Sequence, residues 1–255
     1  MRNVFITTLV AMAFAGTAMA QTVSGEVTLD AAENAAGNWA VTTGFELGVN
    51  ANGLGSVDLD FSATDGGSVT LENWTVGTTI GSVDVAIGDD NGLFPGAEGE
   101  HTLAAPAMAE SVKLSYGSAV VAVGFTDWTN DLTDIGNVQA AYTMPVGEMS
   151  VTAVGDYNIN TENFVLGAAV SGINVASVGL GGSVTWDNDA EVFAYEAVAN
   201  AYGVTAYANG DNNDALQNVG GSYDYVLGGA TLSAGANYDL DAKEFAPTVG
   251  VTFSF

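Results

Sequence analysis

The sequence predicts an all-β fold: a membrane-spanning antiparallel β-barrel of about sixteen strands, in a range of roughly 12–18. Three observations support this prediction. The chain opens with an export signal, its remainder alternates between apolar and polar residues in segments of about ten, and the connections between segments alternate between tight and longer. A closed barrel accounts for all three, because its strands have two unlike faces and its two rims carry unlike connections.

Residues 1–20 have the three parts of a secretory signal peptide. Arg2 gives a positive start, residues 4–16 are apolar, and Ala18-Met19-Ala20 is a small-residue cleavage site. The apolar run is too short to span a bilayer, which argues against an inner-membrane anchor. We therefore expect cleavage and export, with residues 21–255 forming a single transmembrane β-barrel domain.

The charge balance is strongly acidic. The chain has 30 acidic residues against 3 Lys and Arg. Loss of the signal peptide removes Arg2 and leaves two bases, Lys113 and Lys243, and a formal charge of −28. Because nucleic-acid binding depends on Lys and Arg, this balance argues against a nucleic-acid partner and favours small cations. The chain has no cysteine, which excludes disulfides and thiolate metal sites.

Residues 39–49 (WAVTTGFELGV) illustrate the alternation. Odd positions are mostly large and apolar, whereas even positions are small or polar. A period of two over this length predicts a strand with two different faces. The pattern predicts strands at approximately 21–30, 39–50, 55–63, 68–80, 82–88, 111–117, 118–127, 135–144, 148–159, 162–171, 174–187, 190–200, 201–209, 215–227, 229–240 and 244–255.

Two segments need separate interpretation. Segment 68–80 changes phase near Asn73, which indicates a β-bulge. Residues 163–186 carry no charge over 24 residues, a length that would suit a membrane helix. They also contain five glycines and a turn-like Ser-Gly-Ile-Asn at 171–174, so we interpret them as a hairpin.

The connections fall into two alternating sets. One set is tight and nearly uncharged, and the other is longer or acidic, which is the asymmetry of an outer-membrane barrel. Aromatic residues also gather near both rims, as expected of interfacial girdles. The tight set is 51–55, 80–82, 116–118, 145–147, 171–174 and 227–229, and the longer set is 31–38, 127–134, 158–163, 187–189, 210–214 and 239–244. The aromatics are Trp39, Trp128, Trp186, Tyr157, Tyr238 and Phe245 near the longer loops and Tyr116, Tyr142, Tyr225, Phe253 and Phe255 near the tight turns.

Residues 89–110 form a long irregular connection between short strands at 82–88 and 111–117. A long loop inside a compact β array is usually functional or disordered. We expect this one to fold back into the barrel that it interrupts.

Three stretches, two of them at the C-terminal end, resemble the Gram-negative general porins, especially those of alphaproteobacteria. Residues 221–238 (GSYDYVLGGATLSAGANY) and 249–255 (VGVTFSF) are similar to the last strands of that family, and 81–89 (GSVDVAIGD) is similar to the strand before its constriction loop. In these porins a terminal Phe with alternating hydrophobes is the signal read by the barrel-assembly machinery. The resemblance assigns that signal here to Phe253 and Phe255.

The resemblance implies a trimer of sixteen-stranded barrels whose third outer loop, here 89–110, narrows the pore. In the family, loop carboxylates face a basic cluster on the wall. This chain departs from that pattern because Lys113 is the one base expected to face the lumen. The candidate constriction residues are Asp89, Asp90, Glu98, Glu100 and Lys113, and the wall offers Glu46, Asp58, Asp60, Glu72 and Asp84 where the family has arginines.

Carboxylates lining a water-filled lumen concentrate cations and exclude anions. The alternation alone also fits a soluble β-sandwich with a solvated acidic face. No nucleophile, base and acid come together in a catalytic pattern, so we expect no enzyme. No cofactor is expected beyond weak Ca²⁺ binding by the acidic loops, with Asp187, Asp189, Asp211 and Asp214 as candidate ligands.

These features predict an outer-membrane porin for passive diffusion of small hydrophilic solutes and ions, preferring cations. The expected partners are outer-membrane lipid, lipopolysaccharide, the barrel-assembly machinery and two further copies of the chain. Two alternatives remain open: a structural or adhesive barrel without an open pore, and an exported soluble β-sandwich that binds ligands. Detergent dependence and conductance distinguish the three.

Overall fold

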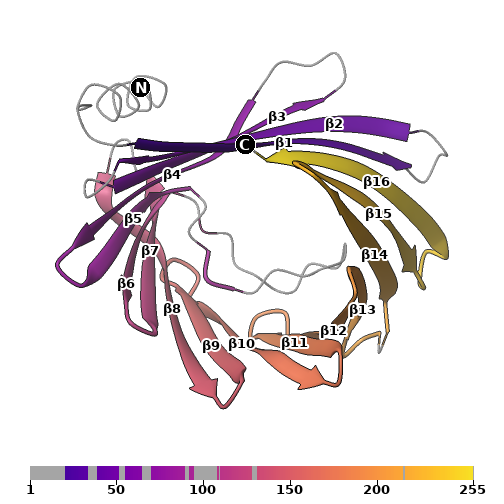
Figure 1. Cartoon of the computed structure of the whole chain (residues 1–255). Coiled ribbons are helices and arrows are strands. Elements are labelled where there is room, and N and C mark those ends of the chain that lie inside the picture. Colours follow the sequence, from indigo (N-terminus) through magenta and orange to yellow (C-terminus); the bar gives the residue numbers. More distant parts are fainter. Residues whose placement is uncertain are drawn as a thin grey trace.

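The computed structural model describes residues 21–33, 39–51, 55–64, 70–89, 92–94, 108, 110–127, 131–214 and 216–254. Sixteen antiparallel strands pair in chain order, and β1 closes the ring against β16, as Figure 1 shows. The predicted fold class and strand number are confirmed. Within these residues no helix has the length and apolar character needed to cross a bilayer. The strands are β1 (Gln21–Glu33), β2 (Trp39–Ala51), β3 (Gly55–Thr64), β4 (Thr70–Ile80), β5 (Val83–Gly88), β6 (Ser111–Tyr116), β7 (Ala119–Asp127), β8 (Asp131–Val146), β9 (Met149–Asn158), β10 (Asn163–Val175), β11 (Val178–Asp187), β12 (Val192–Ala201), β13 (Val204–Asp211), β14 (Asn218–Leu227), β15 (Ala230–Asp239) and β16 (Glu244–Ser254).

The two faces of the barrel wall have the reverse polarity of a water-soluble protein, with apolar side chains outside and polar side chains inside. On β9 and β10, Tyr157 and Leu166 are 47% and 49% exposed, whereas Asp156 is 5% exposed. Asp156 pairs in register with Gln139, which contacts the segment inside the ring. The period-two alternation therefore directs polar residues inward and apolar residues outward, as in a membrane barrel.

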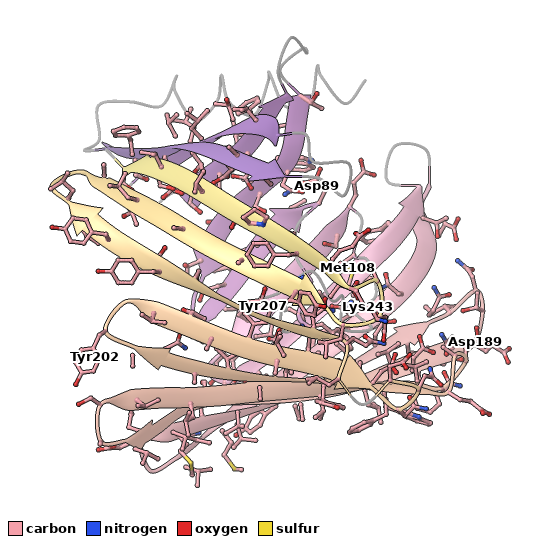
Figure 2. All side chains as sticks on the ribbon, turned by 90° about the vertical axis from the view of Figure 1, so that its right-hand side faces the viewer. Asp89, Met108, Asp189, Tyr202, Tyr207 and Lys243 are labelled. Carbon is pink, nitrogen blue, oxygen red and sulfur yellow. The ribbon has the colours of Figure 1, made fainter. Side chains whose placement is uncertain are left out.

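The tight connections form one rim. Six of them are two-residue turns, and the first residue of each has a positive φ, which matches the right-handed twist of the flanking strands. Figure 2 shows Tyr202, in the β12–β13 turn, at the opposite end of the molecule from Asp189 in a longer loop. The turn residues with positive φ are Gly81 (67°), Gly117 (58°), Gly147 (66°), Ala176 (57°), Tyr202 (54°) and Gly228 (65°).

The predicted turn at 171–174 is wrong, although the hairpin prediction is confirmed. Strand β10 continues to Val175, and the turn lies at Ala176 and Ser177. Gly172 has a φ of 76° because it lies in a β-bulge, where the register shifts between Val170 and Ile173. A glycine inside a strand marked a bulge, which the sequence pattern does not distinguish from a turn.

Four of the longer connections share one design. Asn158, Asp187, Asp211 and Asp239 each accept two hydrogen bonds at Oδ1, from the backbone N–H groups two and three residues later, at 2.6–3.1 Å. These Asx turns close the loops locally. Neighbouring strands add further bonds, since the backbone N–H of Phe164 donates to Asn188 Oδ1 and that of Phe193 donates to Asn212 Oδ1, each at 2.7 Å. In three of the loops a left-handed residue follows: Glu162, Glu191 and Lys243.

The predicted bulge near Asn73 is confirmed. Asp60 pairs with Asn73, and Phe61 pairs with Leu71, so Glu72 is the extra residue on β4. The bulge restores the register, and it explains why the alternation of segment 68–80 changes phase at this point.

Candidate functional site

The segment between β5 and β6 begins at a fixed point on the wall. The Asp89 carboxylate accepts a hydrogen bond from the backbone N–H of Trp74 at 2.6 Å, and the backbone N–H of Asp89 donates to the Trp74 carbonyl at 3.1 Å. Asp89 therefore extends the β4–β5 ladder by one residue. One oxygen of this predicted constriction carboxylate is engaged with the wall itself.

The described part of the segment then runs inside the ring (Figure 1). The backbone N–H of Leu93 donates to Gln139 Oε1 on β8 at 2.8 Å. Phe94 lies against Gly167 on β10, where a Cβ would come within 3.1 Å of the ring. These contacts confirm that the segment folds into the lumen.

The returning end of the segment also packs on the inner wall. Met108 is 6% exposed, and a Cβ at Gly124 on β7 would lie 2.6 Å from its sulfur. Figure 2 shows Asp89 and Met108 between the two rims. The described residues at both ends of the segment therefore lie away from the two mouths of the barrel.

Strands β8 to β15 give the interior a wall of amides and hydroxyls. Asn137 Nδ2 donates to Asp156 Oδ1 at 2.8 Å, and Asn237 Nδ2 donates to Asn218 Oδ1 at 3.2 Å. Tyr207 donates to Asn237 Oδ1 at 3.1 Å. The buried polar residues of this amide wall are Asn137, Gln139, Asp156, Ser183, Thr185, Glu196, Asn209, Asn218 and Asn237. These amides were not predicted as site residues, although they occupy the polar positions of the predicted alternation.

Strands β1 to β5 give the opposite side a wall of carboxylates. The backbones of Glu26, Glu46 and Asp60 form one cross-strand row, and Asp58 lies two positions from Asp60 on β3. Asp58 and Asp84 are exposed, and Glu26 and Asp60 are half-buried. These residues are called the acidic wall (Glu26, Asp58, Asp60 and Asp84). Asp58, Asp60 and Asp84 are among the residues predicted to line the lumen. The side chains of Glu46 and Glu72 lie outside the described part of the structure.

Lys113 lies on β6 beside this wall. Its backbone pairs with Ala86 of β5, and Asp84 pairs with Ser115 two positions along. Lys113 and Asp84 both line a cavity of about 380 Å³ on the inner face of β3 to β6. The predicted partners Asp90, Glu98 and Glu100 lie outside the described residues. Among the residues that are described, Asp84 is the predicted site carboxylate that shares this cavity with Lys113.

The candidate metal ligands do not form a metal centre within the described residues, where no group of three or more suitable side chains is found. Asp187 and Asp211 instead cap their own loops. The loops after β13 and β15 nevertheless approach each other. Partial desolvation, followed by repulsion from Asp214, Asp239 and Asp211, raises the pKa of Asp241.

The aromatic residues expected near the rims are exposed wherever they are described. Phe245 and Tyr238 are 65% and 39% exposed near the longer loops, and Tyr116 and Tyr142 are 64% and 56% exposed near the tight turns. Phe253 is 52% exposed on the outer face, and Phe255 lies outside the described residues.

The fold is similar to that of solved bacterial porins, whereas the sequence matches no known family. No protein-family model and no curated protein sequence matches the chain. Among solved structures, an engineered variant of the Rhodopseudomonas blastica porin is similar, with a TM-score of 0.65 and 13% identity over 92% of this chain and 100% of that one. Pseudomonas putida OprB has a TM-score of 0.60 and 13% identity over 92% of this chain and 92% of that one. The outer-membrane channel DcaP of Acinetobacter baumannii has a TM-score of 0.58 and 10% identity over 92% of this chain and 97% of that one. The chain thus has the barrel fold of bacterial porins.

Proposed function

We propose that this chain is an outer-membrane channel through which small hydrophilic solutes and ions diffuse passively, with a preference for cations. The observation that carries the proposal is the inverted wall, polar inside and apolar outside, around a closed ring of sixteen strands. A polar interior supports a water-filled path, and an apolar exterior supports a surround of lipid. We assign no enzymatic step to the chain.

The cation preference rests on the charges at inward positions. Lys113 is the one base at an inward position of the described strands. The described inward carboxylates include Glu26, Asp58, Asp60, Asp84, Asp156, Glu196, Asp224 and Asp239. Because the Debye length at physiological ionic strength is about 8 Å, charges on a narrow lumen wall act on every ion that passes.

The inner segment is the proposed determinant of pore size. Leu93, Phe94 and Met108 hold its two ends against β7, β8 and β10. A segment fixed at both ends occupies lumen that solutes would otherwise use. The constriction of the pore by Asp89, Asp90, Glu98, Glu100 and Lys113 is part of this proposal.

The location and partners follow from the signal peptide and the outer surface. We place the chain in the outer membrane of a Gram-negative bacterium, with lipid and lipopolysaccharide around it and Phe253 and Phe255 in the assembly signal. We also propose a homotrimer. The trimer rests on the resemblance to the general porins. Retention of a trimeric mass in mild detergent would support this assignment, and a monomeric mass would contradict it.

Weak Ca²⁺ binding by Asp187, Asp189, Asp211 and Asp214 is a separate proposal for the outer rim. Carboxylate oxygens are suitable Ca²⁺ ligands, and a bound ion could bridge lipopolysaccharide phosphates. Isothermal titration with millimolar Ca²⁺ tests this proposed binding, and the absence of a heat of binding would contradict it.

The reversal potential in a planar bilayer under a KCl gradient tests the main proposal. Stable open steps with a cation-selective potential are expected from refolded protein without its signal peptide. Well-inserted protein that carries no current would indicate a structural barrel. Anion preference would show that the carboxylates do not control the ions in the lumen.

A further inference from the structure

The cavity on the inner face of β3 to β6 has a floor whose centre is formed by very small residues. Ser56, Gly77, Ala86 and Lys113 follow one another in a single row across the four strands. The two middle residues have nothing beyond a Cβ, so the row forms a trough with a hydroxyl at one end and an ammonium at the other. Strands in a sheet lie about 4.8 Å apart, which makes the trough long enough for a small solute.

A second polar row borders this floor. Thr79, Asp84 and Ser115 pair across β4, β5 and β6, two positions nearer the tight-turn rim. Thr79 donates to Asp84 Oδ1 at 2.7 Å, which fixes the carboxylate in place. The exposed Asp84 carboxylate still has lone pairs available to a solute.

The Lys113 ammonium forms no hydrogen bond or ion pair with any described residue, although Asp84 is its diagonal neighbour. Diagonal cross-strand neighbours are about 7 Å apart at Cβ. The trough therefore holds a positive and a negative group side by side, and Asp84 is already oriented by Thr79 rather than by Lys113.

We propose that this cavity binds small zwitterionic solutes, α-amino acids above all. The Lys113 ammonium takes the solute carboxylate, and the Asp84 carboxylate takes the solute ammonium. This inference rests on the proposed channel function for its physiological meaning, because it names a solute class for that pore. The binding step itself requires only the folded barrel.

The surrounding charges favour a zwitterion over a simple ion. Asp58 lies two positions along β3 from Ser56, and Asp60 lies two further on, so a free anion approaching Lys113 meets repulsion from the acidic wall. A simple cation leaves Lys113 unpaired. A zwitterion has no net charge to be repelled and satisfies both groups by charge-assisted hydrogen bonds. The cavity of about 380 Å³ accommodates such a solute together with water.

Saturation-transfer difference NMR on the refolded barrel in detergent tests the site without requiring an open pore. The probes are L-alanine, propionate, which lacks the ammonium, and alaninamide, which lacks the carboxylate. We expect a saturable signal from the alanine methyl group. Propionate and alaninamide should each bind with at least about tenfold lower affinity than alanine. Because these three probes use the unsubstituted protein, the comparison does not depend on any variant folding.

Two substitutions locate the site. Lys113→Met and Asp84→Asn should each weaken alanine binding by about tenfold or more. Lys243→Met is the matched control, because it removes the same charge from the exposed β15–β16 loop and should leave binding unchanged. Equal signals from all three probes, or alanine binding unaffected by both cavity substitutions, would overturn the proposal. Alanine binding without conductance would refute the channel function alone, and conductance without alanine binding would refute this site alone.

Discussion

The interior of the barrel has two chemically different sides. The acidic wall on β1 to β5 holds carboxylates that are exposed or half-buried, and Asp58 and Asp84 are open to water. The amide wall on β8 to β15 holds mostly neutral groups that are buried, and Gln139 and Asn209 are 0% exposed. Both walls occupy the same positions of the alternation, so the strand pattern does not explain the difference.

Desolvation explains it. Burying an ionised carboxylate costs far more than burying an amide that finds a hydrogen-bond partner. The inner segment packs against β7, β8 and β10 through Phe94, Met108 and the Leu93 backbone, and amides and small residues receive it there. Where a carboxylate does lie within the amide wall, as at Asp156, it accepts a hydrogen bond from Asn137. The comparison suggests that the acidic wall controls ion selectivity and the amide wall controls the position of the segment.

The largest expected effect comes from neutralising the acidic wall. In the triple variant Glu26→Gln, Asp58→Asn, Asp60→Asn, the cation preference should fall clearly, because three of the four carboxylates of the acidic wall are gone. Folding stability should not fall, since these like charges repel one another across the strands. The reversal potential and urea unfolding in detergent measure the two effects.

A matched variant removes three charges from the outer rim instead: Asp189→Asn, Asp214→Asn, Asp241→Asn. These side chains are exposed, and salt screens them over about 8 Å at physiological ionic strength, so the reversal potential should change much less. An equal shift from both triples would mean that selectivity is not set by the acidic wall.

A second prediction addresses the amide wall. Gln139→Leu removes the acceptor for the Leu93 N–H and a hydrogen bond to Asp156. Because buried polar groups are left without partners, we expect a loss of about 1–3 kcal/mol in unfolding free energy with little change in selectivity. Asn200→Ala is the control, since Asn200 is exposed and its loss should cost under about 0.5 kcal/mol. If the selectivity shifts as much as in the acidic-wall triple, the proposed division between the walls is wrong.

A third prediction concerns the space that the segment occupies. A Cβ at Gly167 would lie 2.8 Å from Val154 Cγ1 and 3.1 Å from Phe94, whereas a Cβ at Gly179 would meet nothing closer than 3.8 Å. Gly167→Ala should therefore cost about 1 kcal/mol and alter single-channel conductance by displacing Phe94. Gly179→Ala should be neutral or slightly stabilising and leave conductance unchanged. Identical behaviour of the two variants would argue against contact between Phe94 and β10.

The fold was largely predictable because its determinants are local. Alternation and turn residues act over a few positions, and they were enough to give sixteen strands and the bulge beside Asn73. The turn at Ala176 was missed because an alanine at a left-handed position gives no sequence signal, whereas Gly172 inside the bulge gives a misleading one. The Asx turns were not predicted, and their loops were interpreted only as acidic. An Asp that caps a loop and an Asp that binds a cation cannot be distinguished in the sequence.

The site was less predictable because it depends on contacts between distant residues. Leu93 and Gln139 are 46 positions apart, and no local pattern indicates which polar residue of β8 receives the segment. Charge was visible, so the acidic wall was anticipated in part. The trough beside Lys113 could not be anticipated, because it arises from the cross-strand register of Gly77 and Ala86.

The smallest expected effect lies outside both walls, at the outer rim. The pKa of Asp241 is raised above its ordinary value of 3.8, so ionisation of this carboxyl disfavours the folded state. The destabilisation begins as pH rises past that ordinary value, and it is complete above the pKa of the folded protein. Asp241→Asn should therefore be slightly more stable than the unsubstituted chain at pH 7, with a difference that disappears in acid and shrinks in high salt.

Thermal unfolding in detergent at pH 7 and at a pH below 3.8, each at low and high salt, measures this effect. Asp241→Glu is the control, because it keeps an ionisable carboxyl beside Asp214 and Asp239 and should follow the unsubstituted chain. A stabilisation that is the same at both pH values would show that it comes from the amide itself rather than from relief of charge repulsion. If the stabilisation instead appears only at pH 7, the two sets of carboxylates differ in effect because they differ in position. Carboxylates inside the lumen act on passing ions, and carboxylates on the rim act mainly on one another.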